Sequence, residues 1–190
     1  MAERPLLDVQ RLTTYFFMPG YTVRAVDGVS FTLGHGETLG VVGESGCGKS
    51  QTAMSLMRLI DYPPGKIMQG RISLEEVDLL QLDHEKMRRV RGNQISMIFQ
   101  EPMTSLNPVF SVGYQLSEAL LLHTGLSKEE AREESRRLLE TVGISDPADR
   151  LDEFPFQLSG GLRQRVMIAM AMACDPQMMI ADEPTTALDV

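Results

Sequence analysis

The chain has 190 residues, of which 43% are hydrophobic, so it can form one domain with a hydrophobic core, with or without a small inserted subdomain. Its formal net charge of −8 argues against a nucleic-acid partner, because binding to a phosphate backbone normally needs a basic face. The two cysteines, Cys47 and Cys174, form no disulfide framework or metal-ligand spacing, which fits a reducing cytosol. No stretch approaches the ~20 apolar residues of a membrane span, and the N-terminus lacks the apolar core of a signal peptide.

The first part of the chain is rich in β-strand signals. Leu6–Leu12 alternates apolar and polar residues, and Val23–Leu33 is a second β-rich run. The residues Met18-Pro-Gly-Tyr21 between them are typical of a turn, so the two runs predict an antiparallel β layer. A third run, Glu37–Val42, is short and apolar and predicts a buried strand.

A phosphate-loop motif follows the third run. Gly43–Ser50 reads Gly-Glu-Ser-Gly-Cys-Gly-Lys-Ser, which matches G-x-x-x-x-G-K-[ST], and Gln51–Ile60 then has the apolar spacing of a helix. A strand–loop–helix junction directs backbone N–H groups and the positive end of the helix dipole at one point. A glycine-rich turn that only resembles the motif is the alternative, but the complete motif in this context favours binding of a di- or triphosphate.

Each residue type of the loop suits this chemistry. Gly43, Gly46 and Gly48 allow positive φ and a close approach of the backbone to phosphates. Lys49 is expected to reach the β- and γ-phosphate oxygens, and the hydroxyl of Ser50 to ligate the bridging Mg²⁺.

The middle of the chain mixes strands and short helices. Arg71–Leu74 predicts an edge strand and Asp83–Val90 a short basic helix. Ile95–Phe99 predicts a buried strand, and the segment that begins at Gln100 and ends at Pro108 follows it, where chemistry is expected.

Two helices are expected next. The first is Val112–His123, and the second is Lys128–Val142. The second has the better end signals: Ser127 as N-cap, Glu130 three residues later as a capping box, and Gly143 just past its end.

A third helix is expected over Gly161–Cys174, where a stripe of methionines indicates core packing rather than a cofactor site. The strand Gln177–Ala181 then leads directly into Asp182 and Glu183. An isolated acidic pair is more often a helix N-terminus or an exposed turn. With a phosphate loop upstream, we expect Asp182 to hold Mg²⁺ through a water and Glu183 to act as general base.

A Ser-Gly-Gly sequence opens the third helix. Ser159 could be an ordinary N-cap, or Ser159, Gly160 and Gly161 could present N–H groups and a hydroxyl to an anion. Since one nucleotide does not need two such helix starts in one chain, this second start would serve a nucleotide held by another copy or a paralogue.

Taken together, these motifs resemble the ATP-binding subunits of ABC transporters over essentially the whole chain, most closely the dipeptide, oligopeptide and nickel importers. The markers, in chain order, are Walker A at 43–50, the Q-loop Gln100, the signature at 158–164, the end of Walker B at 180–183 and the D-loop at 187–189. The resemblance implies an α/β fold: a P-loop NTPase (RecA-like) core over 1–107 and 176–190, with an antiparallel β layer, and an inserted α-helical subdomain over 108–175 that carries the signature.

The resemblance also implies a set of site residues. Phe16 would stack on adenine, Gln100 would contact Mg²⁺ and the attacking water, and Gln51 replaces a common threonine near the α-phosphate. The expected nucleotide contacts are Phe16, Gly43, Glu44, Ser45, Gly46, Cys47, Gly48, Lys49, Ser50, Gln51, Ser159, Gly160, Gly161 and Asp189. The expected catalytic residues are Glu183, Gln100 and Lys49, and the expected metal ligands are Ser50, Gln100 and Asp182.

The implied cofactors are ATP and Mg²⁺, and the implied function is ATP hydrolysis coupled to uptake of peptides or a similar small solute. The implied partners are a second ATPase subunit, identical or paralogous, transmembrane permease subunits at the cytoplasmic face of the membrane, and indirectly a solute-binding protein. None of His35, His84 and His123 matches the family's switch histidine, so we expect a chain truncated after the D-loop. A non-transport ABC ATPase acting on nucleic acid or the ribosome, or an inactive nucleotide-binding fragment, are the alternatives.

Overall fold

The structure of the protein is a computed structural model that describes residues 4–100 and 105–183. The chain divides into two compact units, residues 1–87 and residues 88–190, which are described here one at a time. The short helix α2 (His84–Val90) crosses the boundary between them along the chain and confirms the short helix predicted there.

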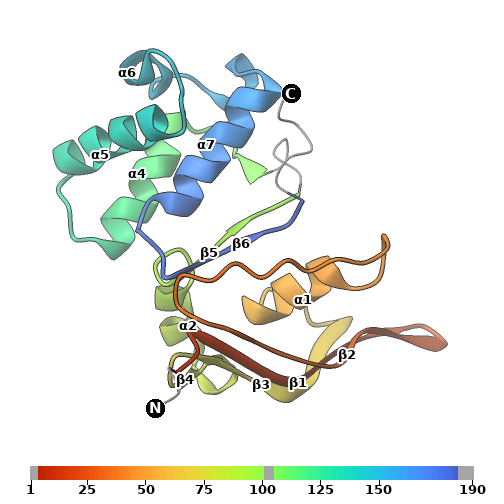
Figure 1. The fold of residues 1–190 in the computed structure, drawn as a ribbon. Coiled ribbons are helices and arrows are strands. Elements are labelled where there is room, and N and C mark those ends of the chain that lie inside the picture. The colour runs from red at the N-terminus through yellow and green to blue at the C-terminus, as the bar shows by residue number, and fades with distance from the viewer. Residues whose placement is uncertain (1–3, 101–104, 184–190) are drawn as a thin grey trace. The chain divides into compact units, whose positions relative to one another are not determined.

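The first unit is built on an antiparallel sheet with the strand order β2-β1-β3-β4 (Figure 1). Its elements are β1 (Leu7–Met18), β2 (Tyr21–Leu33), α1 (Lys49–Leu56), β3 (Gly65–Leu74), β4 (Val77–Asp78) and the 3₁₀ turn η1 (Leu79–Gln81). The predicted antiparallel layer is therefore confirmed. The third strand begins at Gly65 rather than Arg71, and it is not an edge strand, because β4 pairs along its outer side.

Helix α1 lies against one face of this sheet (Figure 1). A buried hydrogen bond ties the two together, since the Oγ1 of Thr14 in β1 lies 2.8 Å from the Oγ of Ser55 in α1. The apolar side of the sheet supplies Leu7, Leu12 and Ile72, which are fully buried. This packing holds α1, which begins at the end of the phosphate loop, in place against the sheet.

Residues 37–42 differ from the prediction. They have no regular secondary structure, and Leu39, Val41 and Val42 are 45%, 56% and 92% exposed. An apolar run becomes a buried strand only when neighbouring strands bond its backbone and other elements cover its faces. Among the described residues no strand pairs with this segment, because β5 and β6 pair only with each other. The prediction of a buried strand here is wrong.

The second unit contains a parallel strand pair and a helical layer. Its elements are β5 (Ile95–Ile98), α4 (Val112–His123), α5 (Lys128–Thr141), α6 (Pro147–Arg150), the 3₁₀ turn η2 (Pro155–Gln157), α7 (Gly160–Met172) and β6 (Met178–Ala181). β5 pairs with β6 in parallel, with Ile95 opposite Met178 and Ile98 opposite Ala181. The strands and the long helices thus lie close to their predicted ranges.

Helix α7 packs on both of its sides. Leu116 of α4, Leu139 of α5 and Val166 of α7 belong to one buried cluster. Met167 of α7 packs in a second cluster with Ile98 of β5. The methionine-rich helix is therefore core, as predicted, and it joins the helical layer to the parallel strands (Figure 1).

The ends of α5 follow the predicted signals. The Oγ of Ser127 accepts from the Glu130 backbone N–H, and the Glu130 carboxylate accepts from the Ser127 backbone N–H at 2.8 Å, which completes a capping box. Gly143 ends the helix with φ 74°. Within the described residues, no helix combines the length and the apolar character needed to cross a membrane.

Candidate functional site

The phosphate loop has the predicted positive φ at Gly46 and Gly48 but not at Gly43, where the prediction is wrong. Gly46 and Gly48 have φ 79° and 99°, and Gly48 is the N-cap of α1, which begins at Lys49. A Cβ on Gly43 would lie 2.6 Å from the Cys47 Sγ. The left-handed φ at Gly46 and Gly48 and the close contact at Gly43 favour glycine at these positions, because a side chain there would be strained or would clash. The loop therefore leaves its backbone accessible, and residues 43–47 are exposed.

The Lys49 side chain folds back over its own loop. Its Nζ donates hydrogen bonds to the Gly43 carbonyl at 2.9 Å and to the Glu44 carbonyl at 3.0 Å. The ammonium group therefore lies beside the loop at the N-terminus of α1, where the helix dipole also favours an anion. Ser50 follows in the first turn of the same helix. This arrangement suits the phosphates of a nucleotide.

A bulge in β2 anchors this loop to the β layer. Arg24 pairs with Tyr15 and Val26 pairs with Thr14, so Ala25 is an extra residue between two ladder pairs. A Cβ on Gly48 would lie only 2.2 Å from the Ala25 carbonyl oxygen. The N-cap of α1 thus packs directly on the β2 backbone, a contact that no sequence signal predicted.

Phe16 lies on the α1 side of the sheet. Side chains of a strand alternate between faces, so Phe16 shares a face with Thr14, which bonds Ser55 of α1. Tyr15 is on the opposite face, where its hydroxyl donates to Asp27 Oδ1 at 2.9 Å and its ring lies 5.6 Å from the Arg24 guanidinium. The hydrogen bond to Asp27 raises the pKa of Tyr15. Of these two neighbouring aromatic residues, only Phe16 is on the loop's side of the sheet.

In the second unit, two predicted catalytic residues meet. Gln100 follows β5 and Glu183 follows β6, and the Nε2 of Gln100 donates to Glu183 Oε2 at 2.7 Å. The Asp182 backbone N–H also donates to the Ile98 carbonyl at 3.0 Å, which extends the parallel pairing. Because the strands are parallel, their carboxyl ends lie at one edge, where α/β proteins place their ligands. Glu183, the last described residue, has a left-handed φ of 48°.

Ser159 is the N-cap of α7, which begins at Gly160. Its Oγ accepts from the Leu162 backbone N–H at 3.3 Å. The ordinary-cap interpretation is therefore confirmed, while a role toward a second nucleotide stays a prediction. Gly160 is exposed, and a Cβ there would meet nothing within 4 Å.

The predicted magnesium ligands are an alcohol, an amide and a carboxylate. Ser50 belongs to the first unit, and Gln100 and Asp182 belong to the second, at the ends of adjacent strands. Hard oxygen donors of this kind suit Mg²⁺, which usually keeps waters and binds few protein groups. Accordingly, the part of the chain that the structure describes contains no group of three or more His, Cys, Asp and Glu side chains able to hold a metal. Asp189 and the D-loop lie outside the described residues.

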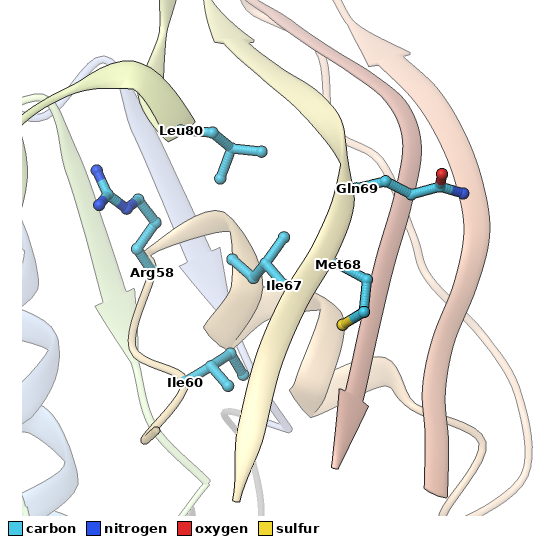
Figure 2. Close-up of a pocket in the computed structure, with 6 residues that line it drawn as sticks. All are labelled: Arg58, Ile60, Ile67, Met68, Gln69 and Leu80. Carbon is cyan, nitrogen blue, oxygen red and sulfur yellow. The ribbon is translucent and has the colours of Figure 1, made fainter. Parts of the chain in front are cut away.

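The first unit also contains a cavity of about 400 Å³ away from the loop. Figure 2 shows its lining residues, Arg58, Ile60, Ile67, Met68, Gln69 and Leu80. The Nη1 of Arg58 donates to the carbonyls of Leu79 and Leu82, at 2.9 and 2.7 Å. None of the predicted site residues lines this cavity.

The chain is similar to known proteins both in sequence and in structure. The family described as ABC transporter matches residues 26–186. The chain is 55% identical to the dipeptide transport ATP-binding protein DppD of Bacillus subtilis and 50% identical to DppD of Escherichia coli, in each case over 97% of this chain. It is 52% identical to the oligopeptide transport ATP-binding protein AppD of Bacillus subtilis, also over 97% of this chain. It spans 55–56% of the length of these three relatives.

Among solved structures, an ATP-binding cassette determined as a dimer in a post-hydrolysis state with ADP and phosphate superposes with a TM-score of 0.85. It is 28% identical, and the alignment covers 96% of this chain and 76% of that one. A second dimeric structure of the same cassette, described as a bacterial ABC transporter cassette, superposes equally well, with 27% identity and the same coverage. These two structures confirm the predicted fold class, a P-loop NTPase core with an antiparallel layer and helices.

Proposed function

The chain belongs to the ABC transporter family, and we propose that it is the ATP-binding part of an importer subunit that couples ATP hydrolysis to the uptake of peptides or a similar small solute. The observation that carries the hydrolytic part is the hydrogen bond between Gln100 and Glu183 at the ends of β5 and β6. The names of the relatives, dipeptide and oligopeptide transport ATP-binding proteins, support the importer part.

In this proposal the phosphate loop binds the nucleotide. Lys49 exchanges the loop carbonyls for the β- and γ-phosphate oxygens, and the exposed residues 43–47 offer backbone N–H groups to the same phosphates. Phe16 stacks on the adenine. Ser50, Gln100 and Asp182 would hold Mg²⁺, which neutralises charge on the phosphate oxygens when bound.

The hydrolytic step is assigned to Glu183. Its carboxylate accepts a proton from a water whose oxygen attacks the γ-phosphorus, while the bond to the β-phosphate oxygen breaks to give ADP and phosphate. Gln100 fixes the direction of that carboxylate through the 2.7 Å hydrogen bond. We therefore assign Gln100 a second role besides metal binding, that of holding the general base in place.

We place the signature helix at a nucleotide on a second ATPase subunit, identical or paralogous. The exposed Gly160 at the start of α7 leaves backbone N–H groups accessible to an anion. Two dimeric structures of one similar cassette support an arrangement of paired subunits.

Binding to a membrane permease is proposed for the apolar surface at the start of α4, at the cytoplasmic face of the membrane. Val109, Phe110 and Tyr114 are 70%, 40% and 53% exposed, and the rings of the last two stack with centroids 4.6 Å apart. Exposed apolar groups gathered in this way are typical of an interaction surface. This surface belongs to the proposed helical subdomain, 108–175, and a solute-binding protein would act through the permease.

The test is ATP binding and hydrolysis by the full-length protein in the presence of Mg²⁺. Lys49→Ala should weaken ATP binding by about 100-fold or more, because it removes the cation that contacts two phosphates. Glu183→Gln should keep ATP binding and lower kcat by about 100-fold or more. Lys86→Ala is the matched control, since this exposed lysine lies outside the phosphate loop and pairs with Asp83 at 3.2 Å. Equal ATP affinity of the wild type and Lys49→Ala would contradict the proposal.

A further inference from the structure

We propose that Gly65 is a positioning residue for Phe16, and through that ring for the base of the bound nucleotide. The proposal rests on the proposed ATP binding. Gly65 is the first residue of β3 and lies opposite Phe16 in the β1–β3 ladder. Directly opposed residues of an antiparallel pair place their side chains on the same face, so any side chain at Gly65 would compete with Phe16 for space.

The available space at Gly65 is filled from two directions. A Cβ there would lie 2.7 Å from Cε1 and 3.1 Å from Cδ1 of the Phe16 ring. It would also lie 2.5 Å from Cγ2 of Ile60. Both distances under 3.0 Å are too short for a real Cβ contact, so the ring, the Ile60 side chain or the backbone must move. Unlike Gly46 and Gly48 of the loop, Gly65 has no left-handed φ, and this contact is the reason that the position suits glycine.

The backbone beside the ring is held on both sides. The Phe17 backbone N–H donates to the Pro64 carbonyl at 2.9 Å, and the Gly65 backbone N–H donates to the Asp61 carbonyl at 2.9 Å. The turn 61–65 is therefore fixed to β1 next to Phe16. Because this backbone is bonded, the ring or the Ile60 side chain is the part that a Cβ would displace.

Displacement of the ring matters because Phe16 is tied to the phosphate loop through β2. Phe16 pairs with Val23, and Ala25 two residues later packs its carbonyl against Gly48 of the loop. The position of the ring relative to the loop is thus set within one unit by two adjacent strands. The base and the triphosphate of one nucleotide can both be bound only when the Phe16 ring and the phosphate loop have the right separation. Moving the ring therefore weakens the contact with the base and leaves the contacts with the phosphates unchanged.

The experiment compares two ligands on the full-length protein: ATP and inorganic tripolyphosphate, which has the phosphates but no base. Gly65→Ala is expected to weaken ATP binding about tenfold or more, as expected for loss of one stacked base, and to leave tripolyphosphate binding within twofold. Gly34→Ala is the control, because the three atoms nearest to its Cβ would all belong to the exposed carboxylate of Glu37, the far end of a flexible side chain.

A double-variant cycle separates positioning from general damage. Phe16→Ala should weaken ATP binding by itself, and adding Gly65→Ala should cause no further loss, because the ring through which Gly65 acts is gone. If the single variant Gly65→Ala does not fold, Phe16→Ala can still be compared with Phe16→Ala/Gly65→Ala. Equal ATP affinities of these two variants would support the proposal.

Three results would overturn the inference: unchanged ATP affinity in Gly65→Ala, equal weakening of ATP and tripolyphosphate, or an additional loss in the double variant. Absence of ATP binding to the wild type would instead reject the proposed function, and the two failures are therefore distinguishable.

Discussion

The side-chain amide of Gln100 donates a hydrogen bond to the carboxylate of Glu183 across 2.7 Å. The two residues come from the ends of adjacent parallel strands, β5 and β6. A hydrogen bond to a carboxylate is stronger than one between neutral groups, so it can hold the Glu183 side chain in one direction. In the proposed role of Glu183 as general base, the direction of its carboxylate decides whether the attacking water is in line with the γ-phosphate.

Removal of this amide should therefore affect turnover more than binding. For Gln100→Ala we expect a kcat lower by up to about 100-fold, with a smaller change in the KM for ATP, in phosphate-release assays of the full-length protein. Gln177→Ala, at an exposed glutamine just before β6, is the control. An unchanged kcat in Gln100→Ala would show that the hydrogen bond has no part in hydrolysis.

Gly48 should tolerate no side chain. Gly48→Ala combines a left-handed φ with a Cβ that would lie 2.2 Å from the Ala25 carbonyl. Gly36→Ala is the matched control, because Gly36 has φ 70° and nothing within 4 Å of its Cβ position. In denaturant unfolding, Gly36→Ala should cost about 1–2 kcal/mol for backbone strain alone. Gly48→Ala should lower the unfolding free energy by about 1–3 kcal/mol more, as overpacking does. Equal losses would mean that the Ala25 contact relaxes freely.

The capping box of α5 should make stability depend on pH. Hydrogen bonds from the Ser127 side chain and backbone lower the pKa of Glu130. Because the folded pKa lies below the unfolded one, this contribution is present above the ordinary glutamate pKa of about 4.3 and is lost as pH falls through the lowered value.

Ser127→Ala should accordingly lower the unfolding free energy by about 1 kcal/mol near neutral pH and by less at acidic pH. Ser111→Ala is the control, since Ser111 caps α4 by accepting from the Tyr114 backbone N–H and has no glutamate at the matching position. The decrease in unfolding free energy caused by Ser111→Ala should not change with pH over this range. The measurement is urea unfolding at a series of pH values, and parallel curves for the two variants would contradict the prediction.

The two cysteines should differ in reactivity. Cys47 is exposed in the phosphate loop, whereas burial raises the pKa of the Cys174 thiol. The thiolate is the reactive form, so an alkylating reagent at about pH 8 should label Cys47 and largely spare Cys174. MgATP should slow labelling of Cys47, because bound phosphates would cover the loop. Peptide mass spectrometry after timed labelling measures both rates. Faster labelling of Cys174 than of Cys47 would contradict the prediction.

Local signals in the sequence were sufficient for many parts of this protein. The Ser127 cap with Glu130, the Pro19-Gly20 turn and the glycines of the phosphate loop act within a few residues, so the sequence can reveal them directly. The apolar spacing likewise predicted α4 and α5 nearly to their ends. Short-range hydrogen bonds and backbone preferences decide these features, and they need no knowledge of the rest of the fold.

Residues 37–42 mark the limit of such signals. Their apolar composition predicts a buried strand, but strand formation depends on backbone partners from elsewhere in the chain, and the composition of the segment cannot supply them.

The sequence by itself determined the phosphate-loop motif and the acidic pair after β6, because these depend on residue type and local spacing. Only the tertiary structure decided that Gln100 bonds Glu183 across 83 residues, that the Ala25 carbonyl packs on Gly48, and that Phe16 lies over Gly65. Each of these contacts joins strands or loops distant in the sequence, and their pairing is set by how whole strands and helices bury their apolar faces against one another.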